Sequence, residues 1–396
     1  MSHSVRQPLR VCFVVSYFHP FASGAERQAL AQALDLVRRG HLVHVVTRSV
    51  PGYPIDEEDY QGIFIHRCVH TSDRGPLFAL SFVSGVIRAL RRLRGQVDVI
   101  HTHQALWEAV ATGLARSLLL EIPTLVQPAS SGYYGEADEL RRTRGSALLR
   151  RIILRNTGLA AISAEIEGQW LELGVPKCRI ARMASGVDAG HFHPGASPLE
   201  THLLPRPRVI FTGRLHPQKN LPLLLAAWQE VTRQVSANLI LVGPGSDRET
   251  LGRLATQLGI IDRVQFVGAV ADPADHLRAA DVFVLPSVAE GMSNSLLEAM
   301  ATALPCVVSG IGGNSDLVTD HETGRLVADA TPQAWTSTLL ELLRNPEEAR
   351  RLGTGARRRI GEQFSLAAVV DRYLDLYQAL VDGHWPARET SIVSGS

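Results

Sequence analysis

Cysteine, lysine and long apolar runs are the scarce features of this sequence. Its four cysteines, Cys12, Cys68, Cys178 and Cys306, include no Cys-x-x-Cys pair, which argues against a disulfide framework and against a zinc site. No segment approaches the ~20 consecutive apolar residues that span a bilayer. The short apolar run at 11–18 lacks the cleavage site of a signal peptide, so we expect it to form a buried strand. These absences favour a cytoplasmic protein in a reducing compartment.

The composition is that of a globular protein with nearly balanced charge. The chain has 396 residues, of which 45% are hydrophobic and 20% charged, and its net charge is +1. A total so close to zero does not suggest a nucleic-acid partner. The charge is unevenly distributed, because residues 1–190 hold 22 basic and 17 acidic residues whereas residues 191–396 hold 18 and 22. The length predicts more than one domain, at roughly 100–200 residues each.

Strand-like and helical patterns alternate along both halves of the chain. This alternation predicts a doubly wound parallel sheet in each half, with ligands bound outside the carboxyl ends of the strands. The stretch 190–207, rich in Gly and Pro, is typical of a linker and separates the expected domains 1–190 and 206–366. Residues 386–396 are expected to be a loose tail. The expected strands are 9–18, 42–47, 63–67, 97–102, 124–127 and 158–162, then 208–212, 237–242, 264–267, 282–285 and 306–309.

Two carboxylates in the second half, Glu290 and Glu298, stand eight residues apart around the start of an expected helix. This helix is expected to begin at Ser293, and its free N–H groups and positive dipole end suit a diphosphate. Glu290 can accept hydrogen bonds from sugar hydroxyls, and Glu298 from a ribose diol. A structural alternative stays open, in which Ser295 and Glu298 form a capping box and Glu290 is a solvated turn residue.

The loop after the first strand of the second half holds two cations, Arg214 and Lys219. Both can stabilise the negative charge that develops on a leaving diphosphate, which is often the largest catalytic contribution. The lysine is an exception in this chain, which has 38 arginines and only one other lysine, Lys177. An ammonium and a planar guanidinium act differently at a phosphate. The alternative is that both are solvated loop cations.

From Glu290 to Asn314 the residue order resembles the Glu-x7-Glu motif of retaining glycosyltransferases of family 4, which have the GT-B fold. The matching residues are Glu290-Gly-Met-Ser-Asn-Ser-Leu-Leu-Glu298-Ala-Met-Ala, Leu304-Pro-Cys-Val-Val and Gly312-Gly-Asn314. The resemblance implies two Rossmann-like domains facing each other across a cleft, with the last helix, 367–382, packing back on the first domain. It places Glu290 by the donor sugar, with Arg214 and Lys219 as further catalytic residues, and Glu298 on the ribose. The amides expected to face the diphosphate belong to Gly291, Met292, Ser293, Asn294 and Ser295.

The same resemblance adds backbone positions on other loops. Gly213 begins the family's Gly-Arg-Leu…Lys-Asn pattern, Gly243 ends the next strand near the nucleotide, and the backbone at Val270 meets the base. In the first half, Gly24 opens a helix and approaches the donor phosphate and the acceptor. The family carries Gly where this chain has Ser23, so close approach is less easy there. Ser23 also suits a helix cap, because a Glu follows three residues later.

Two histidines, His101 and His103, end a buried strand on the same side of the expected sheet. They resemble a metal pair, but no third ligand is evident, so a buried hydrogen-bonded role and a contact in the cleft are the other interpretations. Family members often carry a His after the strand at 124–127 that contacts the donor sugar, whereas this chain has Gln127-Pro-Ala-Ser130. His103 and Ser130 are therefore candidates for the sugar or acceptor contact.

No Asp-x-Asp motif of the metal-dependent glycosyltransferases appears, and the acidic run 56–59 is expected to be a solvated turn. Arg214 and Lys219 would do the work otherwise assigned to a divalent cation. We therefore expect transfer without a metal and without any cofactor besides the donor substrate.

A basic amphipathic helix is expected at 141–155, where Arg144, Arg151 and Arg155 form a stripe beside apolar positions, and a second basic cluster lies at 88–94. Such helices suit anionic lipid surfaces and predict a peripheral position on the inner face of a membrane. The alternative is an ordinary helix packed on the sheet with a solvated arginine edge.

Taken together, these features predict a retaining, metal-independent glycosyltransferase. It would move a hexosyl or hexosaminyl group from a nucleoside diphosphate sugar to a glycan or lipid-linked acceptor in bacterial polysaccharide or glycolipid assembly. Two alternatives stay open. One is a sugar-nucleotide epimerase of the same fold, which would form an epimer or free sugar without acceptor. The other is an inert nucleotide-sugar-binding module, against which the intact carboxylates and cations argue.

Overall fold

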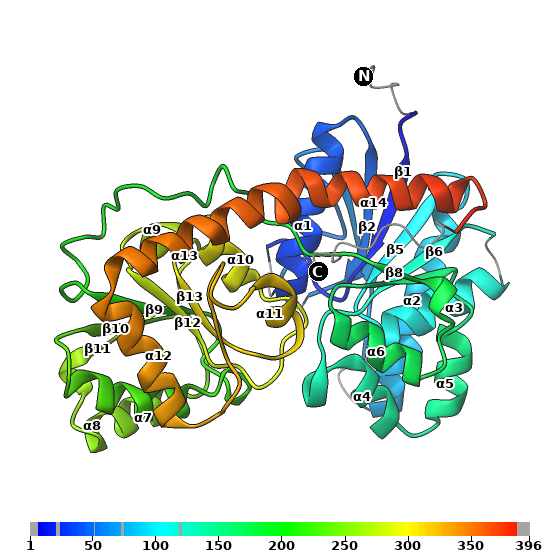
Figure 1. Cartoon of the computed structure of the whole chain (residues 1–396). Helices are drawn as coiled ribbons and strands as arrows, with labels where there is room; N and C mark the ends of the chain where they lie inside the picture. Colours follow the sequence, from blue (N-terminus) through cyan, green and yellow to red (C-terminus); the bar gives the residue numbers. More distant parts are fainter. Residues whose placement is uncertain (1–6, 21–23, 51, 73–74, 119–120, 386–396) are drawn as a thin grey trace. The chain divides into compact units, whose positions relative to one another are not determined.

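The computed structural model describes residues 7–20, 24–50, 52–72, 75–118 and 121–385. The chain forms two compact units, Met1–Ser185 together with Leu366–Ser396, and Gly186–Ser365 (Figure 1). The expectations for Ser23 and for the tail 386–396 lie outside the described residues. None of the helices within the described ranges has the length and apolar character needed to cross a membrane.

The first unit is built on an eight-stranded sheet in the order β3-β4-β2-β1-β5-β6-β7-β8. Its neighbouring strands are parallel except at one edge, where β3 pairs antiparallel with β4. Residues 57–59 of the acidic run, which was expected to be a turn, belong to this edge strand, and the pattern missed it because the run shows no apolar alternation. The strands are β1 Arg10–Val14, β2 Leu42–Arg48, β3 Glu57–Tyr60, β4 Ile63–Val69, β5 Val99–His103, β6 Thr124–Gln127, β7 Gly158–Ala161 and β8 Ile180–Arg182.

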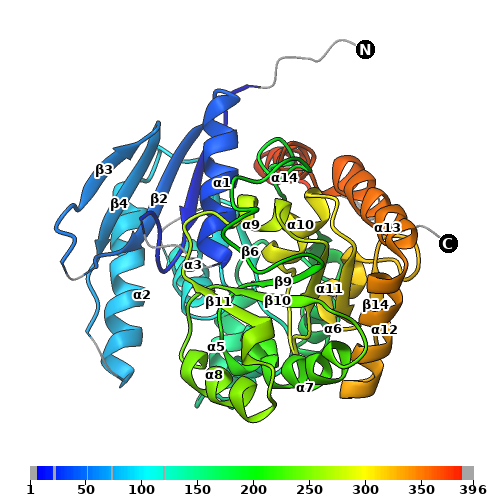
Figure 2. The same ribbon diagram turned by 90° about the vertical axis from the view of Figure 1, so that its left-hand side faces the viewer.

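Helices cover both faces of this sheet. On one face α2 (Gly75–Arg92) and α3 (Trp107–Leu118) pack over a core that includes Cys12, Val14 and Ile100 (Figure 2). The alternate residues of the strands point to the other face, where α1 (Gly24–Arg38) packs beside α14 (Leu366–Val381). The final helix of the chain therefore belongs to the first unit, and it buries an apolar stripe at helical spacing: Val370, Leu374, Tyr377 and Leu380.

The prediction of a single helix at 141–155 is wrong. The structure has α4 (Glu136–Arg142) and α5 (Ser146–Ile153), separated by a turn, and α6 (Ala164–Glu172) follows β7. The break occurs because Gly145 adopts a left-handed conformation with φ of 79°, which glycine takes without steric cost. Arg144 and Arg155 therefore lie outside either helix.

The second unit is built on a six-stranded parallel sheet in the order β11-β10-β9-β12-β13-β14. Its strands are β9 Arg208–Thr212, β10 Asn238–Val242, β11 Val264–Gly268, β12 Val282–Leu285, β13 Cys306–Ser309 and β14 Arg325–Val327. Its helices are α7 Leu221–Thr232, α8 Arg248–Gln257, α9 Ala274–Arg278, α10 Asn294–Ala301, α11 Gly312–Leu317, α12 Pro332–Arg344 and α13 Pro346–Arg359. The doubly wound architecture predicted for both halves is confirmed.

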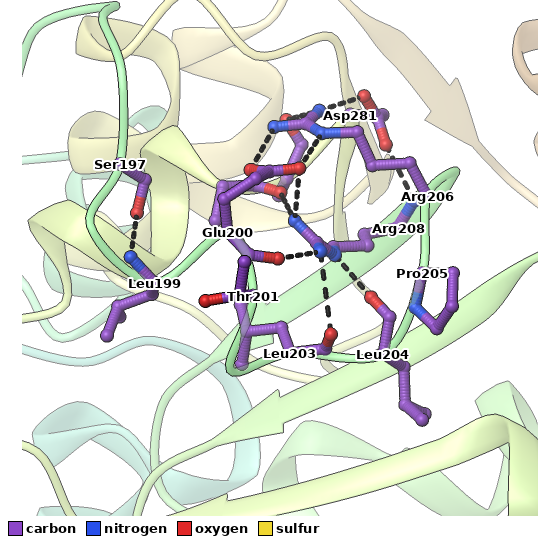
Figure 3. Close-up of polar contacts among 12 residues, drawn as sticks. Ser197, Leu199, Glu200, Thr201, Leu203, Leu204, Pro205, Arg206, Arg208 and Asp281 are labelled. Atoms are coloured by element: carbon purple, nitrogen blue, oxygen red, sulfur yellow. Dashed lines mark hydrogen bonds and ion pairs between the residues drawn. The ribbon is translucent and has the colours of Figure 1, made fainter.

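The stretch expected to be a linker belongs to the second unit and is fastened to it. The Arg208 guanidinium is buried, donating hydrogen bonds to the carbonyls of Ala279 at 3.0 Å and Glu200 at 2.6 Å (Figure 3). Arg206 binds the carboxylates of Glu200 and Asp281. Composition could not reveal this anchoring, because its partners at 279 and 281 lie far along the chain.

Each sheet has one point where the strand order reverses. In the first sheet this point lies between β1 and β5. The chain leaves β1 toward β2 on one side and leaves β5 toward β6 on the other. In the second sheet the same reversal lies between β9 and β12. In open α/β sheets, ligands bind in the crevice outside the carboxyl ends of the strands at such a switch point.

Candidate nucleotide-sugar site

The loops after β9 and β10 are held close together at the carboxyl edge of the second sheet. Gly213 N–H donates to Val242 O at 2.9 Å, and Leu215 N–H donates to Pro244 O at 2.7 Å. Gly243 has φ of 139°, and a Cβ there would overlap the carbonyl of Gly213. Glycine is therefore required at Gly243, because the two loops pack too closely there for a side chain.

An ion pair crosses the switch point of the second sheet. Lys219 lies in the loop after β9 and Glu290 in the loop after β12, and Lys219 Nζ is 2.5 Å from Glu290 Oε1. Ser287 Oγ also donates to Glu290 Oε1 at 2.6 Å, and Gln218 Nε2 donates to Ala289 O at 2.8 Å. The structure thus brings together two of the residues that the sequence assigned to catalysis, and it adds Ser287 and Gln218 as supports.

The chain after Glu290 enters α10 through a capped turn. Ser293 is the N-cap, and its hydroxyl accepts a hydrogen bond from Leu296 N–H at 3.4 Å. The cap is therefore not Ser295, whose hydroxyl instead lies 3.0 Å from that of Ser293. Glu298 is a buried residue within α10 and is 7% exposed. Gly291, Met292 and Asn294 complete the turn at the positive end of the helix dipole.

Hydrogen bonds from the ends of neighbouring elements hold this turn in place. Ser309 Oγ donates to Ser287 O at 2.7 Å, and Asn314 Nδ2 donates to Ser309 O at 3.2 Å. Gly313 N–H donates to Glu290 O at 3.4 Å. Residues 312–314 form the start of α11, and this turn keeps the Glu290 loop in place.

The remaining donor-side residues lie at the carboxyl edge but are less enclosed. Arg214 is exposed, and within the described ranges its guanidinium makes no hydrogen bond or ion pair. Val270 follows β11 and is half-buried. In the first unit, Gly24 is the exposed first residue of α1. Arg214 is thus a cation available to an incoming anion. Lys219 is already paired with Glu290 and would have to leave that carboxylate to bind the anion.

The two histidines of β5 are buried under α14. His101 Nδ1 lies 2.6 Å from the Tyr377 hydroxyl, and the rings of His101 and His103 are 4.2 Å apart. Burial lowers the pKa of both, that of His103 to about 3. Neither ring nitrogen of His103 has a hydrogen-bond partner in the described structure. Among the described residues no three His, Cys, Asp or Glu side chains are grouped as metal ligands.

The loop after β6 is held by a residue that the sequence reasoning missed. The buried Glu136 carboxylate accepts hydrogen bonds from Ala129 N–H at 2.8 Å and Ser130 N–H at 3.0 Å. Burial raises the pKa of Glu136, and these amide donors oppose that effect. Ser130 is therefore fixed at the carboxyl end of β6 and half-exposed. The position of Glu136, six residues after Ser130, is the sequence signal that could have indicated this carboxylate–amide contact.

Two family models match the chain, one for each half. Residues 22–191 match the model described as glycosyltransferase family 4, and residues 206–345 match glycosyl transferases group 1. A D-inositol 3-phosphate glycosyltransferase of Frankia alni is 30% identical over 364 residues, covering 85% of this chain and 89% of that protein. The N-acetyl-alpha-D-glucosaminyl L-malate synthase of Bacillus anthracis is 26% identical, covering 91% of this chain and 94% of that protein.

Solved structures show the same architecture. Sucrose-phosphate synthase from Thermosynechococcus elongatus superposes with a TM-score of 0.81 at 24% identity, covering 96% of this chain and all of that chain. Anabaena HepE, solved with UDP-glucose, superposes with a TM-score of 0.78 at 18% identity, covering 94% of this chain and all of that chain. At these identities the likeness shows the fold, which is GT-B.

Proposed function

Because the chain belongs to glycosyltransferase family 4 and transfers sugar from a nucleotide sugar, we propose that it is a retaining, metal-independent hexosyl- or hexosaminyltransferase. Its acceptor is a glycan or a lipid-linked molecule. The observation that carries this proposal is the Lys219–Glu290 ion pair across the switch point, beside the capped start of α10. It supplies a cation for a diphosphate and a carboxylate for sugar hydroxyls at the place where ligands bind in this architecture.

The proposed donor site divides the nucleotide sugar among three parts of the second unit. The sugar lies by Glu290, the diphosphate lies between the α10 amides of residues 291–295 and the cations Arg214 and Lys219, and the ribose lies on Glu298. The base meets the backbone near Val270, with Gly213 and Gly243 leaving room for the phosphates. In the first unit, Gly24 and Ser130 stay the candidate contacts for phosphate, sugar or acceptor, whereas His103 is only 1% exposed.

The proposed reaction occurs on one face of the sugar. The bond between the anomeric carbon and the diphosphate oxygen breaks, and the acceptor oxygen bonds to the same face of that carbon. The leaving diphosphate takes the proton of the acceptor hydroxyl, so no protein nucleophile is needed. Arg214 and Lys219 stabilise the charge that accumulates on the diphosphate, and a fixed cation acts without reorganisation at that moment.

A calorimetric screen of UDP-, GDP-, ADP- and dTDP-sugars tests the donor assignment, followed by incubation with and without sugar acceptors. One sugar nucleotide should bind and be turned over, and anomeric NMR of the product should show retention. Turnover that is unaffected by a chelator such as EDTA supports metal independence. An epimer formed without acceptor would indicate the epimerase, and binding without any turnover would indicate an inert module.

A further inference from the structure

The switch point of the first sheet carries a polar pair of its own. Ser16 follows β1 and Glu108 lies in the first turn of α3, after β5, and the Ser16 hydroxyl donates a hydrogen bond to Glu108 Oε1. This pair occupies the same topological position as Lys219 and Glu290 in the second sheet, because both join the loop of the central strand to the loop across the reversal. Glu108 is 4% exposed and Glu290 is 6% exposed.

Glu108 differs from Glu290 in having no cation. Among the described residues no Lys, Arg or His lies within ion-pair distance of its carboxylate. Burial raises the pKa of Glu108 to about 7, the hydroxyl of Ser16 lowers it, and the carboxyls of Glu136 and Glu139 in α4 raise it. A buried carboxylate without a cation costs free energy. A negative charge at this position is not needed to join the two loops, because a neutral amide would also accept a hydrogen bond from Ser16.

The backbone that leads to Glu108 is constrained. Gln104 follows β5 with φ of 80°, which is uncommon for a residue other than glycine, and its N–H donates to Gln127 O at 2.9 Å. Such residues concentrate at functional sites. This turn redirects the chain from β5 so that the first turn of α3 meets Ser16 at the end of β1.

We propose that Glu108, oriented by Ser16, is the acceptor-binding carboxylate of this enzyme and accepts a hydrogen bond from a hydroxyl group of a sugar or other polyol acceptor. The inference rests on the proposed function, in which the second unit holds the donor. An arriving hydroxyl replaces the Ser16 hydroxyl as donor to Glu108, and the reaction proton still goes to the leaving diphosphate. The carboxylate form accepts this bond more strongly than the neutral acid or an amide does.

The test uses Glu108→Gln and Ser16→Ala in the full chain, with the donor found in the screen and with n-octyl glucoside, galactoside and N-acetylglucosaminide as acceptor probes. Glu108→Gln should lower kcat/KM for the acceptor by about tenfold or more, mainly through KM. Binding of the nucleoside diphosphate and hydrolysis of the donor by water should change by less than about twofold. Ser16→Ala should have a smaller effect of the same kind.

A matched control and a pH profile separate this role from a structural one. Asp35 is a buried carboxylate in α1 of the same unit, paired with Arg39 at 2.6 Å, and Asp35→Asn should leave acceptor kinetics unchanged. For the wild type, kcat/KM for the acceptor should rise with pH through about 7 because Glu108 ionises, and Glu108→Gln should lose this rise.

Unchanged acceptor kinetics in a folded Glu108→Gln variant would overturn this inference and leave the donor assignment intact. A parallel loss of melting temperature and nucleotide binding would assign Glu108 to the fold instead. Absence of transfer by the wild type to any of the three acceptors would overturn both the acceptor class and this role, whereas absence of donor turnover would contradict the proposed function itself.

Discussion

Lys219 is one of two lysines among 40 basic residues, and its ammonium lies beside the Glu290 carboxylate. The side chains are 13% and 8% exposed, so water screens this pair only partly. Glu290 keeps the ammonium at the switch point before a ligand arrives. Arg214 on the same loop is exposed and needs no such partner. Both cations are therefore expected to stabilise the leaving diphosphate, Lys219 from a position fixed by Glu290 and Arg214 from an exposed position on the same loop.

Replacing either cation should impair turnover more than folding. Lys219→Ala and Arg214→Ala should each reduce kcat by about 10²-fold or more, because a preorganised charge on the leaving group is lost. Steady-state kinetics with the cognate donor measure this, and circular dichroism melting checks that the variants are folded. Near-normal turnover by either folded variant would show that the replaced residue does not stabilise the leaving diphosphate.

The two buried carboxylates should separate nucleotide binding from transfer. Glu298→Gln should weaken binding of the nucleoside diphosphate by about tenfold, because a ribose contact forms with or without the sugar. Glu290→Gln should spare that binding and impair transfer. Calorimetry with the nucleoside diphosphate and initial rates with the donor distinguish the two. Normal nucleotide binding by both variants would favour purely structural roles for these residues.

At the scale of elements, both sheets join the central strand to its neighbour across the switch point by the same reciprocal contact. Arg10 N–H, at the start of β1, donates to Asp98 Oδ2 at 2.8 Å, and Asp98 N–H donates to Arg10 O at 2.7 Å. Arg208 and Asp281 repeat both bonds at 2.7 Å and 2.9 Å at the start of β9. This contact sets the register of β1 with β5 and of β9 with β12.

Removing the carboxylate from either contact should destabilise its own unit. Asp98→Asn and Asp281→Asn should each cost about 1–3 kcal/mol, because hydrogen bonds to a charged acceptor are lost or weakened. Glu249→Gln is the matched control, since in the described part of the chain Glu249 forms just an exposed pair with Arg253 at 3.5 Å. Denaturant unfolding measures the midpoints. An equal midpoint for variant and control would mean that the contact does not contribute to stability.

Protonation of Asp98 should have the same effect as its replacement. The hydrogen bond from Arg10 lowers the pKa of Asp98 below its usual value, while partial burial opposes this. The stabilisation is therefore present above the ordinary pKa of Asp and is lost as pH falls through the lowered folded value.

At the scale of the whole molecule, the chain carries its excess of basic residues in residues 1–190. Part of that excess lies in the segment 133–155, which follows β6 and carries exposed apolar side chains. Tyr133 is 67% exposed with the Arg142 guanidinium 4.3 Å from its ring centroid, and Leu148 of α5 is 63% exposed. Exposed aromatic and leucine side chains among arginines suit the interface of an anionic membrane.

Vesicle binding tests this surface. Replacing Arg144, Arg151 and Arg155 by Gln should abolish co-sedimentation with anionic vesicles without changing donor hydrolysis, and wild-type binding should weaken as salt rises, because the Debye length is about 8 Å at physiological ionic strength. The same change at three exposed arginines of the second unit, Arg233, Arg253 and Arg350, removes equal charge and should not abolish binding. Equal binding of neutral and anionic vesicles, or none, would indicate a soluble acceptor.

The sequence by itself determined the two α/β units and the order of loops at each carboxyl edge. Apolar periodicity and turn residues are local properties, so strands such as 124–127, 208–212 and 282–285 were predicted with their observed ends. The pair Glu290 and Glu298 was placed around the start of a helix for the same reason. The local pattern also misled, because nothing within 141–155 except Gly145 indicates the break between α4 and α5.

Only the tertiary structure decided which side chains meet. Lys219 and Glu290 are 71 residues apart and Ser16 and Glu108 are 92 apart, and both pairs form because strand order brings their loops to one switch point. The anchoring of residues 200–208 depends likewise on carbonyls at 279 and 280. Strand order and register depend on the free energy of packing the whole sheet against its helices, which no local window of sequence contains.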